Sequence, residues 1–144
     1  MTRLTPDGRD AYRYVLAIPT RWADNDIYGH VNNSVYYFYL DTVVNRWLVD
    51  RGLLVVGASE TVGLVVENGC SFFAPIGFPD TVHAGLRVGR IGTSSVTYEI
   101  GLFRNAEQET AARGHFTHVY VDEKTRRPVP ISDTMRETLG EITP

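Results

Sequence analysis

The sequence contains one cysteine and one lysine, and it lacks any long apolar run. Cys70 has no second cysteine to pair with, so a disulfide within the chain is excluded, and one thiol cannot build a zinc site alone. No stretch of about 20 residues is apolar enough for a transmembrane helix. The first ten residues, MTRLTPDGRD, have no apolar core and do not form a secretory signal. We therefore expect a cytoplasmic protein in which Cys70 is a small buried side chain.

The chain also lacks the excess of positive charge that is typical of nucleic-acid binding. Its formal net charge is −3 at pH 7, whereas a basic patch marks a nucleic-acid partner. The 144 residues, of which 43% are hydrophobic and 22% charged, fit a single soluble domain over residues 1–144. The polar residues 1–11 predict a loose lead-in to that domain.

A polar cluster, RWADNDIYGHVN at residues 21–32, directly precedes the most hydrophobic segment. The composition around Asp24 and Asp26 is typical of a turn. From about Asn33 apolar residues recur at helical spacing, which predicts a helix that ends near Gly52. Three residues can cap its start: Asn32, Asn33 and Ser34. The apolar positions are Val35, Tyr36, Phe38, Tyr39, Leu40, Val43, Val44, Trp47 and Leu48. They surround most of the first half of the helix, so we expect it to be buried on several sides.

The rest of the chain is rich in strand patterns. The expected strands are residues 12–18, 62–66, 70–74, 81–91, 95–103 and 110–122, with a short polar helix at 133–140. Glu67, Asn68 and Gly69 form either a turn or a bulge within one long strand. Short turns join the later strands, which indicates an antiparallel meander. One apolar helix and one large antiparallel sheet must bury each other's faces. The sequence therefore predicts an α+β fold with a long central helix wrapped by a curved antiparallel β-sheet.

The segment RWADNDIYGHVNNSVYYFYLD at residues 21–41 is followed, in order, by CSFFAPI, GRIGTSSVTYEI and RRPVPI. This ordered set, over roughly residues 12–138, resembles the hotdog-fold acyl-CoA thioesterases of the 4-hydroxybenzoyl-CoA thioesterase branch. The resemblance implies a hotdog fold and a homodimer or homotetramer whose active site is shared across the dimer interface. It also implies hydrolysis of acyl-CoA with no metal and no cofactor, coenzyme A being part of the substrate. The catalytic carboxylate it implies is Asp26, the second Asp of the D-x-D-x-x-G pattern.

The chemistry of a thioester asks for few catalytic groups. A thiolate leaves readily, so the protein must supply an attacking oxygen and a site for the carbonyl oxygen. Asp26 can serve as a general base on water or as a nucleophile that forms an anhydride. Free backbone amides at the predicted helix start, near Asn32 and Asn33, can bind the oxyanion.

The remaining candidates have smaller expected roles. Asp24 is a structural hydrogen-bond acceptor in the turn, and His30 orients or packs the site. The candidates for substrate binding are Gly29, His30, Tyr36, Glu67, Asn68 and Gly69. The candidates for the CoA phosphates are Arg90, Arg126 and Arg127, since arginine suits phosphate. The turn at residues 92–94, whose counterpart is basic in the 4-hydroxybenzoyl-CoA enzyme, is neutral in this chain.

Two other functions stay open at this stage. An enoyl-CoA hydratase of the same fold pairs an Asp with a His five residues later in a D-x-N-P-x-H loop. Asp26 and His30 are four residues apart with no proline between them, which fits that geometry poorly. The third interpretation is a non-catalytic acyl-binding or dimerisation module, because a fold alone does not establish activity.

Overall fold

The computed structural model describes residues 3–144, and residues 1–2 lie outside the described range. Within that range the elements are η1 (Arg9–Ala11), β1 (Tyr14–Pro19), η2 (Trp22–Asp24), α1 (Asn33–Asp50), β2 (Thr61–Phe72), β3 (Thr81–Ile91), β4 (Ser95–Arg104), β5 (Ala112–Asp122), α2 (Asp133–Leu139) and η3 (Gly140–Ile142), where η marks a 3₁₀ turn. The predicted order of one strand, a long helix, a meander of strands and a short helix is confirmed.

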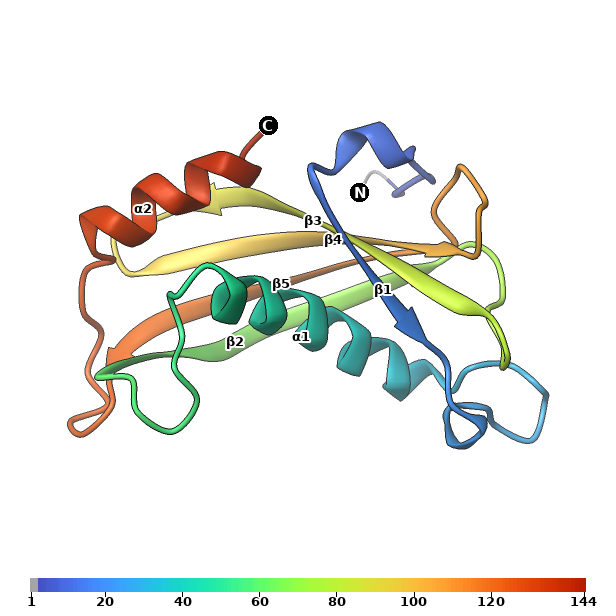
Figure 1. The fold of residues 1–144 in the computed structure, drawn as a ribbon, viewed down its shortest axis with the longest axis horizontal. Helices are drawn as coiled ribbons and strands as arrows, with labels where there is room; N and C mark the ends of the chain where they lie inside the picture. Colours follow the sequence, from blue (N-terminus) through green and yellow to red (C-terminus); the bar gives the residue numbers. More distant parts are fainter. Residues whose placement is uncertain (1–2) are drawn as a thin grey trace.

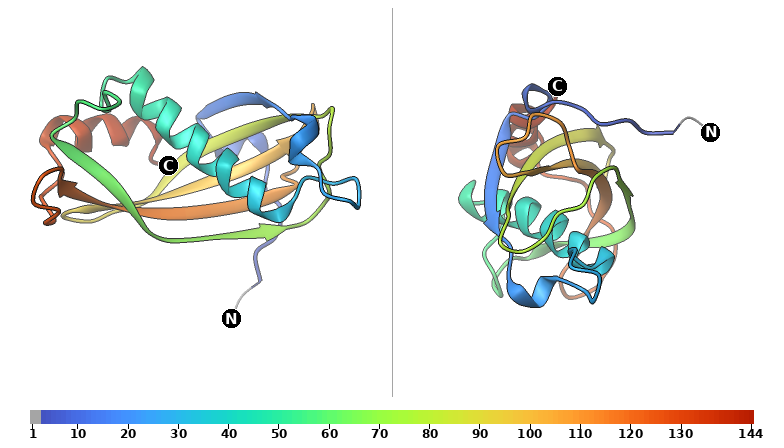
Figure 2. Two further views of the ribbon diagram at one scale, coloured as in Figure 1. Left: turned by 90° about the horizontal axis from the view of Figure 1, so that it is seen from below. Right: turned by 90° about the vertical axis from the view of Figure 1, so that its right-hand side faces the viewer.

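The five strands form one antiparallel sheet in the order β1-β3-β4-β5-β2. The sheet is curved, and α1 lies across its concave face (Figures 1 and 2). This is the predicted hotdog fold. Because β1 and β2 are the outer strands, each has one edge that no other strand of the described chain pairs.

Helix α1 begins and ends where the sequence predicts. The Asn32 side chain caps its start by accepting hydrogen bonds from the Ser34 amide at 2.9 Å and the Ser34 hydroxyl at 2.8 Å. Gly52 follows the C-terminal end with φ 71°, a left-handed conformation that glycine adopts without strain. The two ends of α1 are therefore determined by local capping residues.

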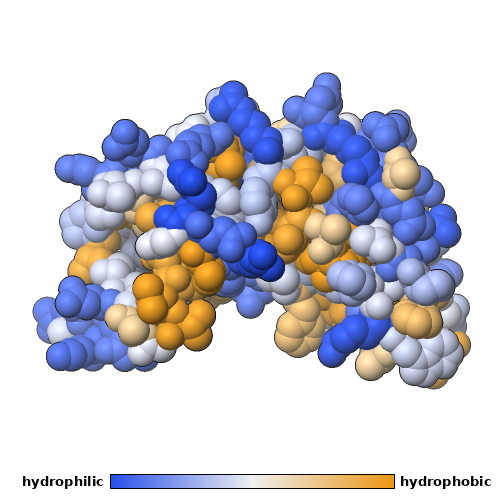
Figure 3. Space-filling view, in the orientation of Figure 1, coloured by the Kyte–Doolittle hydropathy of each residue, from blue (hydrophilic) through white to orange (hydrophobic). Residues whose placement is uncertain are grey.

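The core lies between α1 and the concave face of the sheet. Alternate residues of β3 and β4 point at the helix and are fully or almost fully buried: Val82, Ala84, Leu86, Val88, Val96, Tyr98, Ile100 and Leu102. They pack against the buried stripe of α1: Tyr36, Tyr39, Leu40, Val43, Val44, Trp47 and Leu48. The expectation of burial on several sides is wrong for one flank of the helix, because Phe38 is 65% exposed. Figure 3 shows patches of hydrophobic surface among hydrophilic side chains on this face of the molecule.

Strand β2 settles the alternative that the sequence left open around residues 67–69. It is one strand of 12 residues with a register shift between Val65 and Glu67, which marks a bulge rather than a turn. More than a third of the surface of four of its apolar side chains is exposed: Leu64, Val65, Val66 and Phe72. A long, apolar and unpaired edge strand is a surface that proteins normally cover.

The prediction of a loose lead-in over residues 1–11 is wrong for residues 7–11. Backbone and side-chain hydrogen bonds join Asp7 to Thr110 in both directions, at 3.0 and 3.1 Å. Gly8 forms a bridge with Glu109, and residues 9–11 form η1. The N-terminal segment is therefore fastened to the turn between β4 and β5.

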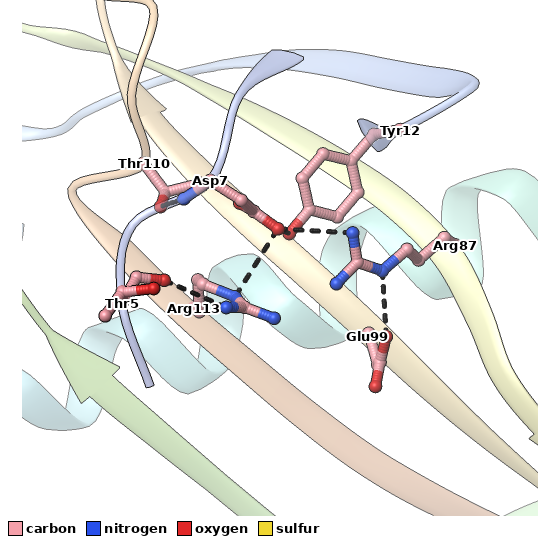
Figure 4. Close-up of polar contacts among 7 residues, drawn as sticks. All are labelled: Thr5, Asp7, Tyr12, Arg87, Glu99, Thr110 and Arg113. Carbon is pink, nitrogen blue, oxygen red and sulfur yellow. Dashed lines mark hydrogen bonds and ion pairs between the residues drawn. The ribbon is translucent and has the colours of Figure 1, made fainter. Parts of the chain in front are cut away.

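A polar cluster on the convex face of the sheet, away from α1, holds the same segment (Figure 4). The Asp7 carboxylate accepts a hydrogen bond from the Tyr12 hydroxyl at 3.0 Å and pairs with Arg87 at 3.2 Å and Arg113 at 3.5 Å. Arg87 also donates to Glu99 at 2.8 Å. We call these five residues, Asp7, Tyr12, Arg87, Glu99 and Arg113, the convex-face cluster.

The ring of Tyr12 fits the sheet because two glycines lie beneath it. A methyl group at Gly85 or Gly101 would approach ring atoms of Tyr12 to 2.6 Å, well inside van der Waals contact. Burial raises the pKa of the Tyr12 hydroxyl, an effect that Arg87 opposes and Asp7 reinforces, so the hydroxyl is a permanent donor.

Candidate active site

Asp26 lies in a short closed loop, residues 25–31, immediately before α1. A bridge between Asn25 and Val31 closes the loop. Within it the Asp26 amide donates to the His30 carbonyl at 2.8 Å, and the Gly29 amide donates to the Asp26 carbonyl at 3.2 Å. Gly29 has φ 81°, which explains the need for glycine at this turn. The predicted turn is confirmed, and its shape is set by local backbone bonds.

Asp24 is buried beneath this loop, with a side chain that is 2% exposed. Its carboxylate accepts hydrogen bonds from the Arg21 amide at 2.8 Å, the Arg21 guanidinium at 3.0 Å and the Tyr39 hydroxyl at 2.8 Å. Burial alone would raise the pKa of the Asp24 carboxyl, but these hydrogen bonds outweigh it and hold the pKa below its ordinary value. Asp24 is thus the structural acceptor that the sequence predicts.

Asp26 has far fewer partners. It is partly buried, and one carboxylate oxygen accepts a hydrogen bond from the Tyr28 amide at 2.8 Å. Among residues 3–144, no other donor reaches this carboxylate. The side chain borders a groove of about 540 Å³ at the start of α1. A carboxylate with a spare oxygen at the wall of a groove can accept a proton from water or attack an electrophile.

The amides at the start of α1 differ in what they already bind. The Asn32 amide donates to the Asp24 carbonyl at 2.8 Å, and the Ser34 amide donates to the Asn32 side chain. The Val35 amide donates to the Asn32 carbonyl at 2.9 Å. The Asn33 amide has no acceptor in the described part of the chain. Asn33 borders the same groove as Asp26, so of the two predicted oxyanion residues only Asn33 offers a free backbone donor there.

Three predicted site residues therefore share one groove with Asn33: Asp26, His30 and Tyr36. His30 is exposed, and its ring forms no hydrogen bond with another residue of the described range. Tyr36 is 4% exposed and packs edge-on against Phe72, with ring centroids 4.9 Å apart. Gly29 lies behind the groove, where a separate pocket of about 330 Å³ opens between it and Arg104.

The opposite wall of the groove consists of residues 72–75, from the end of β2, which we did not assign a role from the sequence. They belong to the motif CSFFAPI, so the signal was present as part of the ordered set. What the sequence could not supply was their distance from Asp26, because 46 residues separate Asp26 from Phe72 along the chain.

Glu67, Asn68 and Gly69 do not border this groove. Glu67 lies on the convex face, where it pairs with His115 at 2.9 Å, and Gly69 lies directly under the His115 ring. Asn68 faces the other side and borders a second groove, of about 470 Å³, beside Phe38. Within one chain these residues and Asp26 belong to different surfaces.

The three candidate phosphate ligands lie at the other end of the sheet. Arg90 is near the end of β3, and Arg126 and Arg127 are in the loop after β5, whereas the Asp26 loop adjoins the end of β2 (Figure 1). All three arginines are exposed. Arg126 has φ 61°, a conformation that is uncommon for a residue with a side chain. Within one chain the arginines and Asp26 do not form a common site.

Two further features bear on the class of site. In residues 3–144 no group of three or more His, Cys, Asp and Glu side chains is arranged to hold a metal ion. None of the described helices has the length and apolar character needed to cross a membrane.

Comparison with known proteins adds a family relationship. A model of the thioesterase-like superfamily matches residues 20–139. A search of curated proteins finds no similar sequence. The PA5185 protein of Pseudomonas aeruginosa is 45% identical, with a TM-score of 0.93 over 96% of this chain and 97% of that one. The PA2801 protein of the same organism is 32% identical, with a TM-score of 0.83 over 89% and 98%. A thioesterase from Thermus thermophilus, complexed with coenzyme A and Zn, is 26% identical, with a TM-score of 0.76 over 89% and 98%.

Proposed function

The chain belongs to the thioesterase-like superfamily and is a thioester hydrolase, and we propose that it hydrolyses acyl-CoA to a free acid and coenzyme A. The observation that carries the proposal is that one groove is lined by both Asp26 and Asn33. Within residues 3–144 the Asp26 carboxylate has one donor, and the Asn33 amide has no acceptor. The Thermus relative complexed with coenzyme A supports a CoA thioester as the substrate class. The narrower assignment to the 4-hydroxybenzoyl-CoA branch, and a cytoplasmic location, stay predictions from the sequence.

In the proposed reaction Asp26 supplies the attacking oxygen. As a general base, its free oxygen takes a proton from a water molecule, and the hydroxide attacks the thioester carbon. The C–S bond of the tetrahedral intermediate then breaks, and the thiolate leaves and takes up the proton. As a nucleophile, Asp26 would attack the same carbon, release the thiolate and form an anhydride that water cleaves. Neither route draws on a metal or another cofactor, and coenzyme A takes part only as the leaving group.

The Asn33 amide is the proposed oxyanion donor. It lies at the positive end of α1, so both its N–H group and the helix dipole favour negative charge on the carbonyl oxygen. A single donor of this kind is typically worth on the order of 10² to 10³ in rate. The buried ring of Tyr36 gives this groove one apolar wall, and a low local dielectric beside the amide would strengthen its field.

A second copy of the chain is the proposed partner, paired along the open edge of β2. A two-fold axis through the middle of that edge would place the start of β2 from the partner beside the end of β2 from this chain. The end of β5, from which the loop with Arg126 and Arg127 leaves, pairs with the start of β2 through Asp122 and Thr61. Such a homodimer, alone or within a homotetramer, would bring Arg126 and Arg127 of one copy toward the Asp26 groove of the other. The dimer would therefore place two candidate phosphate ligands near the candidate catalytic residue, whereas within one chain they lie at opposite ends of the sheet.

The test is release of free thiol from a panel of acyl-CoAs with short, long, branched and aromatic acyl groups. Wild type is expected to hydrolyse some of them, and Asp26→Asn is expected to lose at least about 100-fold in kcat/KM, as for a lost base or nucleophile. Asp10→Asn, an exposed aspartate of η1, serves as the matched control and should keep wild-type activity. Full activity in Asp26→Asn would refute the mechanism, and no turnover of any thioester by wild type would refute the function.

A further inference from the structure

Behind the Asp26 loop, a second loop at residues 76–80 is fixed by the carboxylate of Asp80. One oxygen of Asp80 accepts hydrogen bonds from the Gly77 amide at 3.0 Å and from Arg104 at 2.8 Å. The other oxygen accepts one from the Asn105 side chain at 2.9 Å. The Asp80 carbonyl accepts a further hydrogen bond from the Thr20 amide at 3.1 Å. This single residue therefore joins loop 76–80 to the end of β4 and to the end of β1.

The environment of Asp80 favours its ionised form. Its side chain is 14% exposed, and although burial would raise the pKa of the carboxyl, the hydrogen bonds from Gly77, Arg104 and Asn105 hold it below its ordinary value. Asn105 has φ 50°, a backbone conformation that asparagine tolerates better than most residues, and its side-chain oxygen also accepts from the Thr81 amide. The three partners thus hold Asp80 in one place.

Three contacts connect loop 76–80 to the Asp26 loop. The Val31 amide donates to the Ile76 carbonyl at 2.8 Å, and the Phe78 amide donates to the Asn25 side chain at 3.0 Å. The third contact is between glycines, since a methyl group on Gly77 would lie 2.8 Å from the Gly29 carbonyl oxygen. These contacts fall at the two ends of the Asp26 loop and at its turn, so they define where the loop lies.

We propose that Asp80 is a positioning residue for the reaction: together with Arg104 and Asn105 it fixes loop 76–80 and, through that loop, the direction of the Asp26 carboxylate. The inference rests on the proposed function only for its effect on rate, because the mechanical connection is independent of the substrate. Of the residues that the structure describes, only Tyr28 donates a hydrogen bond to the Asp26 carboxylate, so the position of that carboxylate depends on the backbone that carries it. A displacement of about 1 Å at a catalytic group can lower a rate by about 100-fold.

Gly77→Ala is the sharpest test, because it moves the Asp26 loop without removing any hydrogen-bonding side chain. The added methyl group meets backbone at Gly29, so the loop must shift. We expect kcat to fall about 10- to 100-fold while KM changes less than about twofold. Gly101→Ala is the matched control: it introduces an equally close contact, with Tyr12 on the convex face, and should lower the unfolding temperature while leaving kcat of the folded protein unchanged.

Asp80→Asn tests the carboxylate itself, and amide hydrogen exchange at Val31 and Phe78 provides a readout that needs no substrate. We expect a loss of kcat in the same range and exchange at least about 10-fold faster at both amides in Gly77→Ala and Asp80→Asn. Wild-type exchange rates in both variants would overturn the proposal, as would an equal loss of kcat in Gly101→Ala. If wild type hydrolyses no thioester, the proposed function fails while the exchange rates still decide the positioning role.

Discussion

Two aspartates, Asp7 and Asp26, each lie near a tyrosine, yet their surroundings differ in every other respect. Asp7, in the convex-face cluster, is engaged by Tyr12 and by two arginines whose side chains are 14% and 18% exposed. Asp26, at the groove, is engaged by one backbone amide. Within residues 3–144 three side chains engage the Asp7 carboxylate, whereas one oxygen of the Asp26 carboxylate has no donor.

The difference lies in how much of each carboxylate remains free to bind another group. A carboxylate whose oxygens are held by several donors serves the fold, whereas one with an oxygen that no donor reaches can contact a water molecule or a ligand, as the proposed role of Asp26 requires. Asp24 gives a second example. It is two residues from Asp26, and yet its carboxylate, like that of Asp7, is engaged by several donors. Position along the chain therefore does not distinguish Asp24 from Asp26, whereas the number of donors to each carboxylate does.

The largest expected effect concerns the donor that completes the Asp26 site. Asn33 is the first residue of α1, a position that accepts proline, and Asn32 already has the extended conformation that precedes proline. Asn33→Pro would remove the free N–H group, and kcat should fall about 100-fold. Asn33→Ala keeps the amide and should stay within about twofold of wild type. Equal activities of the two variants in steady-state assays would assign the oxyanion to another donor.

The next effect concerns the other aspartate, Asp7, and is expected in stability rather than in rate. Asp7→Asn would leave Arg87 and Arg113 partly buried without their shared carboxylate, so we expect the free energy of unfolding to fall by about 2 kcal/mol. The proposed active site lies at the start of α1, away from the convex face, so kcat should not change. Urea unfolding and thiol-release assays on the same preparation check both parts. A loss of kcat in the folded variant would show that the two regions are coupled.

The smallest effect is a pH dependence at Asp24. Its folded-state pKa lies below the unfolded value, so its contribution to stability is present above about pH 4 and is lost as the pH falls through the folded-state pKa. Asp24→Asn should therefore be less stable than wild type at pH 7, by about 1 to 2 kcal/mol. The gap between the two should narrow below about pH 4 in urea unfolding curves. If the difference in the free energy of unfolding between wild type and Asp24→Asn stays constant with pH, Asp24 does not contribute to the loss of stability in acid.

The sequence predicted the parts of the fold that local patterns determine. The start of α1 at Asn33, the alternation in β3 and β4, and the structural role of Asp24 depend on spacing and turn composition within about 20 residues. The convex-face cluster was missed because its members are far apart in the sequence, with Asp7 and Arg87 separated by 80 positions. The polar N-terminal segment gives no sign in the sequence that it packs on the sheet, because the glycines that accommodate the Tyr12 ring, Gly85 and Gly101, are far away along the chain.

The candidate site was predictable only in its first half. Asp26, His30, Asn33 and Tyr36 come from one continuous motif, and the structure brings them to one groove. The opposite wall, and the bracing by Asp80, come from residues about 50 positions later. Hydrophobic periodicity in the sequence does not predict such contacts, because they depend on how loops from distant parts of the chain pack together at one end of the sheet.

Cys70 is a single site at which the protein can be labelled with a thiol reagent. Its thiol lies on the concave side of β2, opposite Gly114, and burial raises its pKa to about 11. At neutral pH only about one molecule in ten thousand then carries the reactive thiolate, so a thiol reagent should modify the folded protein slowly. Because the chain has no second cysteine, the rate of labelling would report on how accessible this one partly buried thiol of β2 is in solution.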